Sequence, residues 1–568
     1  MFGAVVAIVA TTLEVLTPVF SLGPVGFTTS EIAVGFFIAT SVVWGLQAGR
    51  RIFRLKSLDL AVILFLASNY LSSALSEDRP SAFKFSLRLT YGTLVYFGIT
   101  RLPRRYRPHL VVAGAIAATV VLVSLVGVLE NFSLTCMKAL LSPFKERIIT
   151  FGAYYNVRIS STLPFPTIFA FYLEMLIPVL LAFGLWLAGT AKELKQRRLL
   201  MVLTLVCTFI PLAAIAYTYT RSAYVVAPAT LLGGAVLAAV CGYGRRVYLS
   251  FAVAAVFFVS LVGVSAVFSN TMAFRLGLAE QEQRFNAEYT LTAITPEFRP
   301  GEKISTRIHA SNRGTEKWAG PGDEPALVVY RWLSYPQMVN QDVELIVADV
   351  PRDVYPGDEV DIDVDVMTPA TPGRYVLVYE LFIDAPFSHT GVSPLVVPVD
   401  LEESGSSLFV IPESPSTFYD RNPAPMSIPR RQLWSAAVSA WKANPILGLG
   451  PDQFRKRYVE FLPGVELDPR LGAHNIFLNA MANTGITGLA ALVYLLASAV
   501  WLLVKTARDR SAAGDVRLLS LGLLVSMIAY IGHGMFEYPL WQTGVMLMWF
   551  ILLGLVSLSA GKTGGRQP

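Results

Sequence analysis

The sequence predicts a polytopic α-helical membrane protein with about 12 transmembrane helices and an inserted all-β sandwich domain on the periplasmic side. Composition is the first reason: of the 568 residues, 54% are hydrophobic and 15% are charged, whereas soluble domains carry about 25% charged residues. The second reason is the recurrence of apolar stretches close to the ~20 residues that cross a bilayer. The third is a long polar segment after Phe268, in which short apolar runs alternate with turn residues.

The expected spans lie in two groups, one on either side of the polar segment. The first apolar stretch has neither the basic start nor the clear small-residue cleavage site of a signal peptide, so we interpret it as a span. The expected spans are 4–20, 32–46, 58–75, 83–99, 110–129, 168–187, 199–217, 223–241 and 247–268, followed by 474–504, 518–535 and 545–558.

Basic residues gather on one side of the predicted spans. Six connections and tails on that side hold 20 of the 46 Lys and Arg residues. The positive-inside rule places them, with both termini, in the cytoplasm and places the polar segment outside. We therefore expect a multi-pass membrane protein and no nucleic-acid partner. The six segments read RRIFRLK, RLPRRYR, AKELKQRR, GYGRRV, KTARDRSAAGDVR and GKTGGRQP.

The polar segment has the composition and pattern of an extracytoplasmic β-sandwich. Between residues 285 and 411 it holds 20 acidic and 8 basic residues, a net charge of −12. Runs such as EVDIDVDVM and RYVLVYELFI alternate with period two, and YPGDE and TPATPG supply turns between them. This order resembles Ig-like and CARDB-like modules, which indicates a fold and says little about function.

We expect the chain to have four parts. They are residues 1–274 with transmembrane helices 1–9, residues 275–420 with the β-sandwich and its linkers, residues 421–473 with a periplasmic helix and active-site loop, and residues 474–568 with transmembrane helices 10–12. In the third part, residues 430–443 are predicted to form an amphipathic helix. The expected apolar face of this helix carries Leu433, Trp434, Val438 and Trp441.

The segment GAHNIFLNAMANTGITGL opens a predicted span with polar side chains. Asn475, Asn479 and Asn483 are spaced at i, i+4 and i+8, so they form one stripe on a helix. We expect the stripe to face the bundle interior and to bond neighbouring helices or a sugar. Gly485 and Gly488 are interpreted as positions of close packing.

Several motifs together resemble the O-antigen ligase and O-antigen polymerase superfamily. RRQLWSAAVSAWKANPILGLGPDQF joins an Arg to a Pro-Ile-Leu-Gly-x-Gly turn, and AHNIFLNAMANTGITGL then places a His-Asn pair at the head of a membrane helix. AYTYTRSAYV resembles the Ser/Thr-Arg-Ser motif of the family, and GHGMFEYPLW its C-terminal element. The resemblance runs from about Tyr217 to the C-terminus, apart from the β segment, and implies a GT-C-like membrane fold.

The resemblance implies an inverting glycosyltransferase that uses no metal and no cofactor and acts at the periplasmic face of the bacterial inner (plasma) membrane. Its donor would be a glycan on a polyprenyl diphosphate such as undecaprenyl diphosphate, as in lipopolysaccharide or other polysaccharide biosynthesis. Its acceptor would be a lipid, another glycan or a protein. Matched by motif, the catalytic residues are His474, Arg221 and Arg430, with Arg431 as the alternative to Arg430.

Elementary chemistry favours the same residues. An Arg guanidinium pairs with phosphate oxygens through two donors, and Arg221 lies in a short connection where a lipid diphosphate would place its head group. A helix N-terminus disfavours imidazolium, so His474 would be the neutral general base. We also expect free N–H groups at this helix end to attract a phosphate.

Further substrate contacts are predicted around these three residues. His533 and Glu537, four residues apart, are expected to form a mutual hydrogen bond or to contact the acceptor, because two ligands make a poor metal site. The three cysteines have no disulfide or metal spacing. The full predicted set is Arg431, Asn475, Asn479, Arg455, Arg457, Arg470, His533 and Glu537.

Two alternatives stay open. An O-antigen or exopolysaccharide polymerase would use the same chemistry with a different acceptor. A polysaccharide or lipid transporter or flippase belongs to another class. Transporters often place polar residues near the bilayer midplane in broken helices, whereas the polar residues of this chain gather at one face of the membrane.

Overall fold

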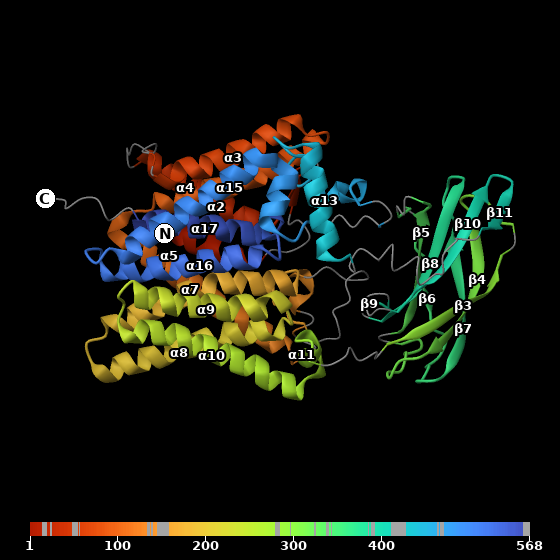
Figure 1. Cartoon of the computed structure of the whole chain (residues 1–568), viewed down its shortest axis with the longest axis horizontal. Coiled ribbons are helices and arrows are strands. Elements are labelled where there is room, and N and C mark those ends of the chain that lie inside the picture. Colours follow the sequence, from red (N-terminus) through yellow and green to blue (C-terminus); the bar gives the residue numbers. More distant parts are fainter. Residues whose placement is uncertain are drawn as a thin grey trace.

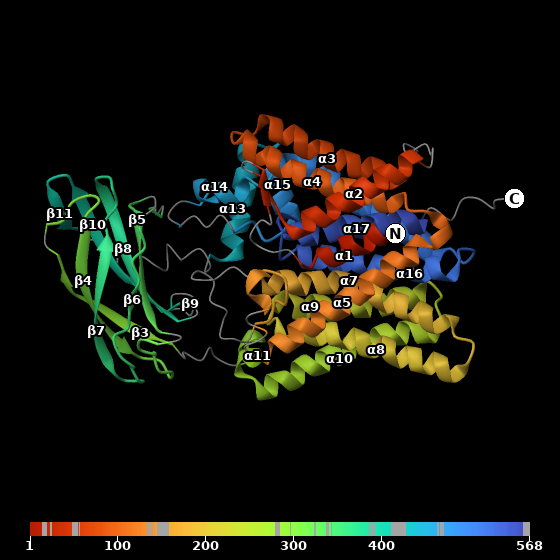
Figure 2. The ribbon, with the colours of Figure 1, turned by 180° about the vertical axis from the view of Figure 1, so that it is seen from behind.

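The computed structural model describes most of the chain as a helical bundle and a separate set of β-sheets. The sheets lie beyond one end of the bundle, and α11 (Asn270–Arg275) and α13 (Arg430–Ala443) lie at that same end (Figure 1; Figure 2). The described residues are 1–560 except 14–19, 23–24, 48–54, 56, 133–136, 138–139, 145–157, 279–284, 296, 323–324, 337–339, 342, 384, 388–391, 410–427, 463–464 and 466–470.

Within the described residues, nine helices are long and apolar enough to cross a membrane. They confirm a polytopic helical membrane protein with an inserted β domain. The spans of α7 and α17 are 89% and 94% buried, so these two helices occupy the centre of the bundle. The nine are α3 (Ser57–Leu75), α5 (Pro108–Glu130), α7 (Pro166–Thr190), α8 (Leu194–Tyr217), α9 (Arg221–Val240), α10 (Arg245–Phe268), α15 (Ile476–Arg508), α16 (Gly514–Gly534) and α17 (Thr543–Ala560).

Three more helices coincide with predicted spans, namely α1 (Phe2–Ala10), α2 (Thr29–Gln47) and α4 (Arg79–Thr100). Helix α4 has 22 residues, but Lys84 and Arg88 interrupt its apolar surface. Helix α1 has nine residues, too few to cross a hydrocarbon core of ~30 Å. The count of 12 transmembrane helices therefore stays a prediction.

The predicted end of the first span was wrong. Helix α1 ends at Ala10, and Phe20 belongs to strand β1 (Phe20–Leu22), which pairs with β2 (Val25–Phe27). At the helix end, the hydroxyl of Thr11 donates to the carbonyl of Ile8 at 2.7 Å. Such local bonds compete with continuation of a helix.

The β domain consists of two antiparallel sheets around one apolar core. The larger sheet has the order β11-β10-β8-β5-β6, with β9 paired to β8, and the smaller sheet has the order β3-β4-β7. Trp318 and Trp332 are fully buried between them. Resemblance to an Ig-like module stays a prediction. The strands are β3 (Ala287–Ile294), β4 (Lys303–Asn312), β5 (Leu327–Ser334), β6 (Ala348–Asp349), β7 (Glu359–Met367), β8 (Gly373–Ile383), β9 (Ala385–Pro386), β10 (Leu395–Glu402) and β11 (Gly405–Leu408).

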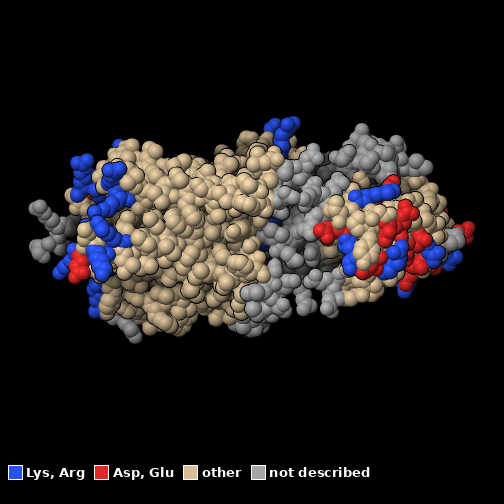
Figure 3. All heavy atoms as spheres, turned by 90° about the horizontal axis from the view of Figure 1, so that it is seen from below, with Lys and Arg blue, Asp and Glu red and all other residues tan. Residues whose placement is uncertain are grey.

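Charge is distributed unevenly along the molecule. Lys and Arg gather at the end of the bundle that points away from the β domain, and the flank of the bundle shown is almost bare of charge (Figure 3). A flank without charge is what a surface in contact with lipid chains requires. The β domain carries both signs of charge (Figure 3).

Helix α13 lies across the ends of the membrane helices (Figure 1; Figure 2). The sequence predicted its existence, but the predicted apolar face was wrong, because Trp434, Val438 and Trp441 are only half-buried. Alanine side chains are short, so they allow the backbone of α13 to approach its neighbours closely. The face that packs inward carries Leu433, Ala436, Ala437 and Ala440.

Helix α15 is broken at Gly485, whose backbone has φ 61° and ψ −161°. A break frees backbone N–H and C=O groups, and in a membrane each unsatisfied group costs several kcal/mol. The loop 445–450, which reads PILGLG, bonds to these groups. The N–H of Ile486 donates to the carbonyl of Pro445 at 2.9 Å, and the N–H of Gly450 donates to the carbonyl of Asn483 at 2.8 Å.

The last turn of helix α3 and the residue that follows it also bond to this loop. The hydroxyl of Ser72 donates to the carbonyl of Leu447 at 2.6 Å, and that of Ser76 to the carbonyl of Leu449 at 2.9 Å. We call this arrangement of loop 445–450, the break in α15 and α3 the loop–helix interlock. It confirms Gly485 as a position of close packing and shows why its backbone needs the left-handed region.

We expect Gly485→Ala to destabilise the protein. The added Cβ would lie 2.3 Å from the carbonyl group of Ile446, and the residue would keep a positive φ. Overpacking and the left-handed backbone together predict a loss of roughly 2–5 kcal/mol in the free energy of unfolding. Thermal unfolding of the detergent-solubilised protein measures this loss.

Gly233→Ala is the matched control for this experiment. Gly233 lies within helix α9, and a Cβ there would meet nothing within 4 Å, so the change should be neutral or stabilising by up to about 1 kcal/mol. Equal melting temperatures for the two variants would contradict the interlock.

Candidate active site

His474 and Glu537 form a hydrogen-bonded pair at the head of α15. His474 Nδ1 lies 3.0 Å from Glu537 Oε1. His474 directly precedes the N-cap of the helix and has a φ of 44°, a backbone conformation that costs energy in a non-glycine residue and is often found at functional sites. Glu537 follows the end of α16 and precedes the short helix η7 (Pro539–Trp541).

This contact determines which nitrogen of His474 carries the proton. A carboxylate only accepts hydrogen bonds, so Nδ1–H donates to Glu537 and Nε2 keeps its lone pair when the ring is neutral. The His474 side chain is 22% exposed and that of Glu537 is 9% exposed. The pair therefore presents an accessible imidazole on a buried carboxylate, an arrangement suited to a general base.

The carboxyl of Glu537 is ionised. Burial is the largest single influence and raises its pKa, whereas the charge of a protonated His474, the hydrogen bond from its Nδ1–H and the hydrogen bond from the N–H of Tyr538 each lower it. The positive charge of Arg430 also contributes, and the net result is a pKa of about 2 instead of 4.5. Arg430, at the start of α13, therefore lies within electrostatic reach of the pair.

Asn475 is the N-cap of α15. Its side-chain oxygen accepts from the N–H groups of Phe477 and Leu478 at 2.9 and 3.0 Å. These two N–H groups are occupied within the protein, and attraction of a phosphate by the other N–H groups of this helix end stays a prediction. The Asn475 amide nitrogen donates to the carbonyl of Met535 at 3.1 Å, which joins the head of α15 to the end of α16.

The other two asparagines of the stripe are buried and bonded within the protein. Asn483 Oδ1 accepts from the N–H of Phe454 at 2.8 Å, and its amide nitrogen donates to the carbonyl of Asn479 at 2.9 Å. Asn479 Oδ1 accepts from the N–H of Ala473 at 3.4 Å. The stripe therefore joins α15 to the loops beside it, and a sugar contact at Asn475 or Asn479 stays a prediction.

His533 belongs to a second carboxylate–imidazole pair. His533 Nδ1 lies 2.6 Å from Glu174 Oε2 of α7, and both side chains are 1% exposed. The mutual hydrogen bond that we expected between His533 and Glu537 was wrong, because each has another partner. His533 Nε2 lies 3.1 Å from the hydroxyl of Ser222, so the buried pair holds the first turn of α9.

Arg221 is the first residue of α9, next to Ser222, and its side chain is exposed. Ser222 contacts His533, and Glu537 lies four residues after His533. The first turn of α9 is therefore linked to the segment that carries Glu537, the partner of His474. The three residues matched by motif lie at helix starts: Arg221 is the first residue of α9, Arg430 is the first residue of α13, and His474 directly precedes the N-cap of α15.

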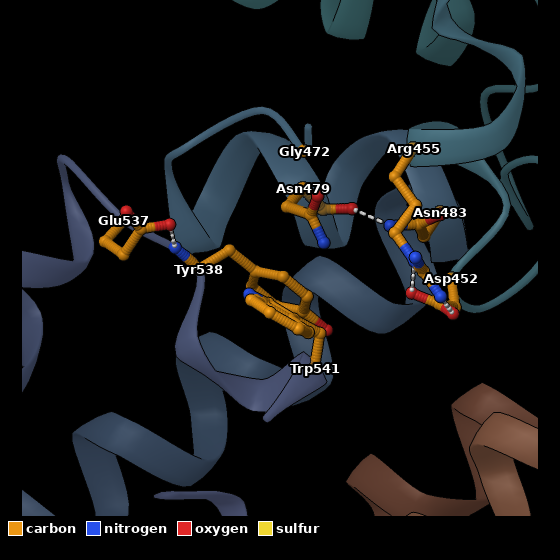
Figure 4. Close-up of a pocket in the computed structure, with 8 residues that line it drawn as sticks. All are labelled: Asp452, Arg455, Gly472, Asn479, Asn483, Glu537, Tyr538 and Trp541. Atoms are coloured by element: carbon orange, nitrogen blue, oxygen red, sulfur yellow. Dashed lines mark hydrogen bonds and ion pairs between the residues drawn. The ribbon is translucent and has the colours of Figure 1, made fainter. Parts of the chain in front are cut away.

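A small pocket lies beside the pair (Figure 4). In it, Arg455 forms a two-pronged ion pair with Asp452 at 2.6 and 2.7 Å (Figure 4). Burial raises the pKa of the Tyr538 hydroxyl, and the Asp452 carboxylate raises it further, so this hydroxyl stays a donor. The pocket is lined by Asp452, Arg455, Gly472, Asn479, Asn483, Glu537, Tyr538 and Trp541.

The basic segment RKR, which contains the predicted substrate contacts Arg455 and Arg457, is engaged with carboxylates. Arg455 bonds Asp452, as described, and Arg457 forms ion pairs with Glu460 at 2.7 Å and with Glu77 at 3.1 Å. Arg431 is exposed on α13, and Arg470 lies outside the described residues. A substrate role for Arg431, Arg455, Arg457 and Arg470 stays a prediction.

Sequence reasoning missed several residues of this region. Arg88 of α4 donates to the carbonyl of Trp541 at 3.0 Å and to the hydroxyl of Thr543. Arg88 and Glu174 are charged residues inside predicted spans, and that position is itself a signal of function. Asp452, Tyr538 and Trp541 had no comparable signal. Among the described residues, no group of three or more His, Cys, Asp and Glu side chains is arranged to hold a metal ion.

Glu537→Gln is expected to lower the melting temperature by an amount that depends on pH. Because folding lowers the pKa of Glu537 from 4.5 to about 2, its carboxylate stabilises the fold above its ordinary pKa, and this contribution is lost as the pH falls through that range. The melting temperature of the unsubstituted protein should exceed that of Glu537→Gln above about pH 5, and the difference should shrink towards about pH 2.

The control for this titration is Glu403→Gln, at an exposed position of the β domain. It should leave the melting temperature unchanged at each pH. A Glu537→Gln difference that persists undiminished at the acid end would contradict the ionised pair.

Comparison with protein families gives one match. Residues 395–493 match the family model described as O-antigen ligase. The matched segment includes Arg430 and His474 and does not include Arg221, His533 or Glu537. The match supports a membrane glycan ligase or polymerase type of function, with a lipid-linked glycan as donor. No curated protein matches the chain.

Proposed function

From the O-antigen ligase match and the site at the head of α15, we propose that the chain is a membrane glycosyltransferase that moves a glycan from a polyprenyl diphosphate to an acceptor hydroxyl. The observation that carries this proposal is the His474–Glu537 pair, within electrostatic reach of Arg430. The end of the bundle rich in Lys and Arg lies in the cytoplasm, so the site and the β domain face the periplasm and both termini are cytoplasmic.

His474 acts as the general base. Glu537 holds the proton on Nδ1, so Nε2 accepts the proton of the acceptor hydroxyl as its oxygen attacks the anomeric carbon of the donor sugar. A carboxylate partner also stabilises the imidazolium that forms. The new carbon–oxygen bond forms on the face opposite the leaving group, so the configuration of the anomeric carbon inverts.

Arg221 and Arg430 bind the diphosphate. The bond between the sugar and the phosphate oxygen breaks, and negative charge grows on the polyprenyl diphosphate that leaves. Guanidinium groups stabilise this charge by paired hydrogen bonds, which are strongest where water is excluded. The buried Glu174–His533 pair positions Arg221, because it holds the adjacent Ser222.

The break in α15 does not favour a transporter. Transporters use broken helices to line a substrate path near the midplane of the bilayer. In this chain, the loop 445–450 bonds to the backbone groups that the break exposes, so the break is occupied by protein. Catalysis at one end of the bundle agrees better with this arrangement.

We expect His474→Ala to lower transfer from a purified lipid-linked donor by about 10²- to 10⁴-fold, the usual contribution of general base catalysis. His474→Gln can still donate a hydrogen bond to Glu537, so it should retain the melting temperature while losing activity. His309→Ala, in the β domain, is the control and should retain full turnover. Normal transfer by the His474 variants would remove this residue from the mechanism.

A second experiment separates Arg430 from Arg431. Both side chains are exposed on α13, but the charge that reaches Glu537 is that of Arg430. Arg430→Ala should lower transfer by at least about 100-fold, as removal of one transition-state donor does elsewhere. Arg431→Ala should stay within about threefold of the unsubstituted enzyme. The reverse result would assign the diphosphate contact to Arg431.

A further inference from the structure

A large groove lies near the basic end of the bundle, remote from the candidate active site. It is bordered by α1, α2, the end of α4, the short helix η1 (Arg104–Tyr106) and α5. Its cavity volume is about 740 Å³, within the roughly 300–1,000 Å³ of pockets that hold small ligands. The lining residues are Met1, Phe2, Gly3, Phe36, Phe37, Thr40, Ser41, Trp44, Gly98, Arg101, Leu102, Pro103, Arg105, Tyr106 and Val111.

The apolar part of the groove opens outward. Phe2 is 76% exposed and Phe36 is 51% exposed. The residues next to each of them in the sequence are apolar. Water is a poor occupant of such a surface, because each buried water needs two to four polar partners. Lipid chains make the dispersion contacts that these rings otherwise lack.

The polar part of the groove is basic. The segment RLPRRYR holds four arginines, of which Arg101 and Arg105 line the groove. Asp59 holds Arg101 by an ion pair of 3.1 Å. The guanidinium of Arg105 lies over the ring of Tyr106, 4.4 Å from its centroid, and within the described part of the chain no carboxylate forms an ion pair with Arg105. A second aromatic side chain, Trp44, lines the same groove.

We propose that this groove binds one anionic phospholipid of the leaflet at the basic end of the bundle. Its acyl chains lie against Phe2 and Phe36, and its phosphate lies beside Arg105. Basic pockets between membrane helices are known to select anionic head groups, and Trp and Tyr are favoured where chains meet head groups. This lipid site shares no residue with the proposed active site, so its test measures lipid binding and needs no glycan transfer.

Native mass spectrometry of the full chain, titrated with dioleoylphosphatidylglycerol or with dioleoylphosphatidylcholine, tests the proposal. We expect one phosphatidylglycerol to be retained at least about 10-fold more tightly than phosphatidylcholine, a difference of about 1.4 kcal/mol. Arg105→Glu should abolish this preference, and Arg105→Gln should reduce it. Thr40→Trp, which adds bulk inside the groove, should weaken the binding of both lipids.

Arg246→Glu is the matched control, because Arg246 is exposed in the first turn of α10 and does not line the groove. It should bind both lipids as the unsubstituted chain does. The melting temperature of each variant verifies that it is folded. Equal retention of the two lipids, retention of the preference in folded Arg105→Gln, or an equal loss in Arg246→Glu would overturn the proposal in favour of non-specific lipid contact.

Discussion

The loop–helix interlock is the constraint on which the end of the bundle next to the β domain depends. Within a membrane, a helix can break only if other parts of the protein bond to the freed backbone groups. The loop 445–450 does so at Gly485, and it also connects α13 to the Asp452–Arg455 segment. The helix that carries Arg430 and the half-helix that follows His474 are therefore positioned by one set of backbone hydrogen bonds.

Exposure distinguishes two sites that have the same chemistry. Glu537–His474 and Glu174–His533 are both carboxylate–imidazole pairs, with contacts of 3.0 and 2.6 Å. His474 is partly exposed, so its second nitrogen can meet a substrate. His533 is enclosed, and its second nitrogen is used by Ser222. Sequence reasoning gave both histidines a role in the active site, His474 as the catalytic base and His533 as a substrate contact, because exposure at the end of a helix is not visible in the residue pattern.

The membrane helices were predictable, and several local details were not. Apolar length defines a span, so the predicted spans coincide with helices such as α5 and α16 to within a few residues. The break in α15 was missed because the apolar run continues through Gly485 without a proline or a charge. The buried face of α13 was missed because it depends on close approach by alanines, whereas hydropathy favours the larger Trp434 and Trp441.

The sequence by itself determined the class of the protein, an apolar bundle interrupted by a β domain, together with the segment around His474 that matches the O-antigen ligase family. These properties depend on the composition of the chain and on which residues follow one another in it. Tertiary structure alone decided which charges meet: the partner of His474 is 63 residues away and that of His533 is 359 residues away. No local periodicity encodes such pairs, because packing of the helices brings them together.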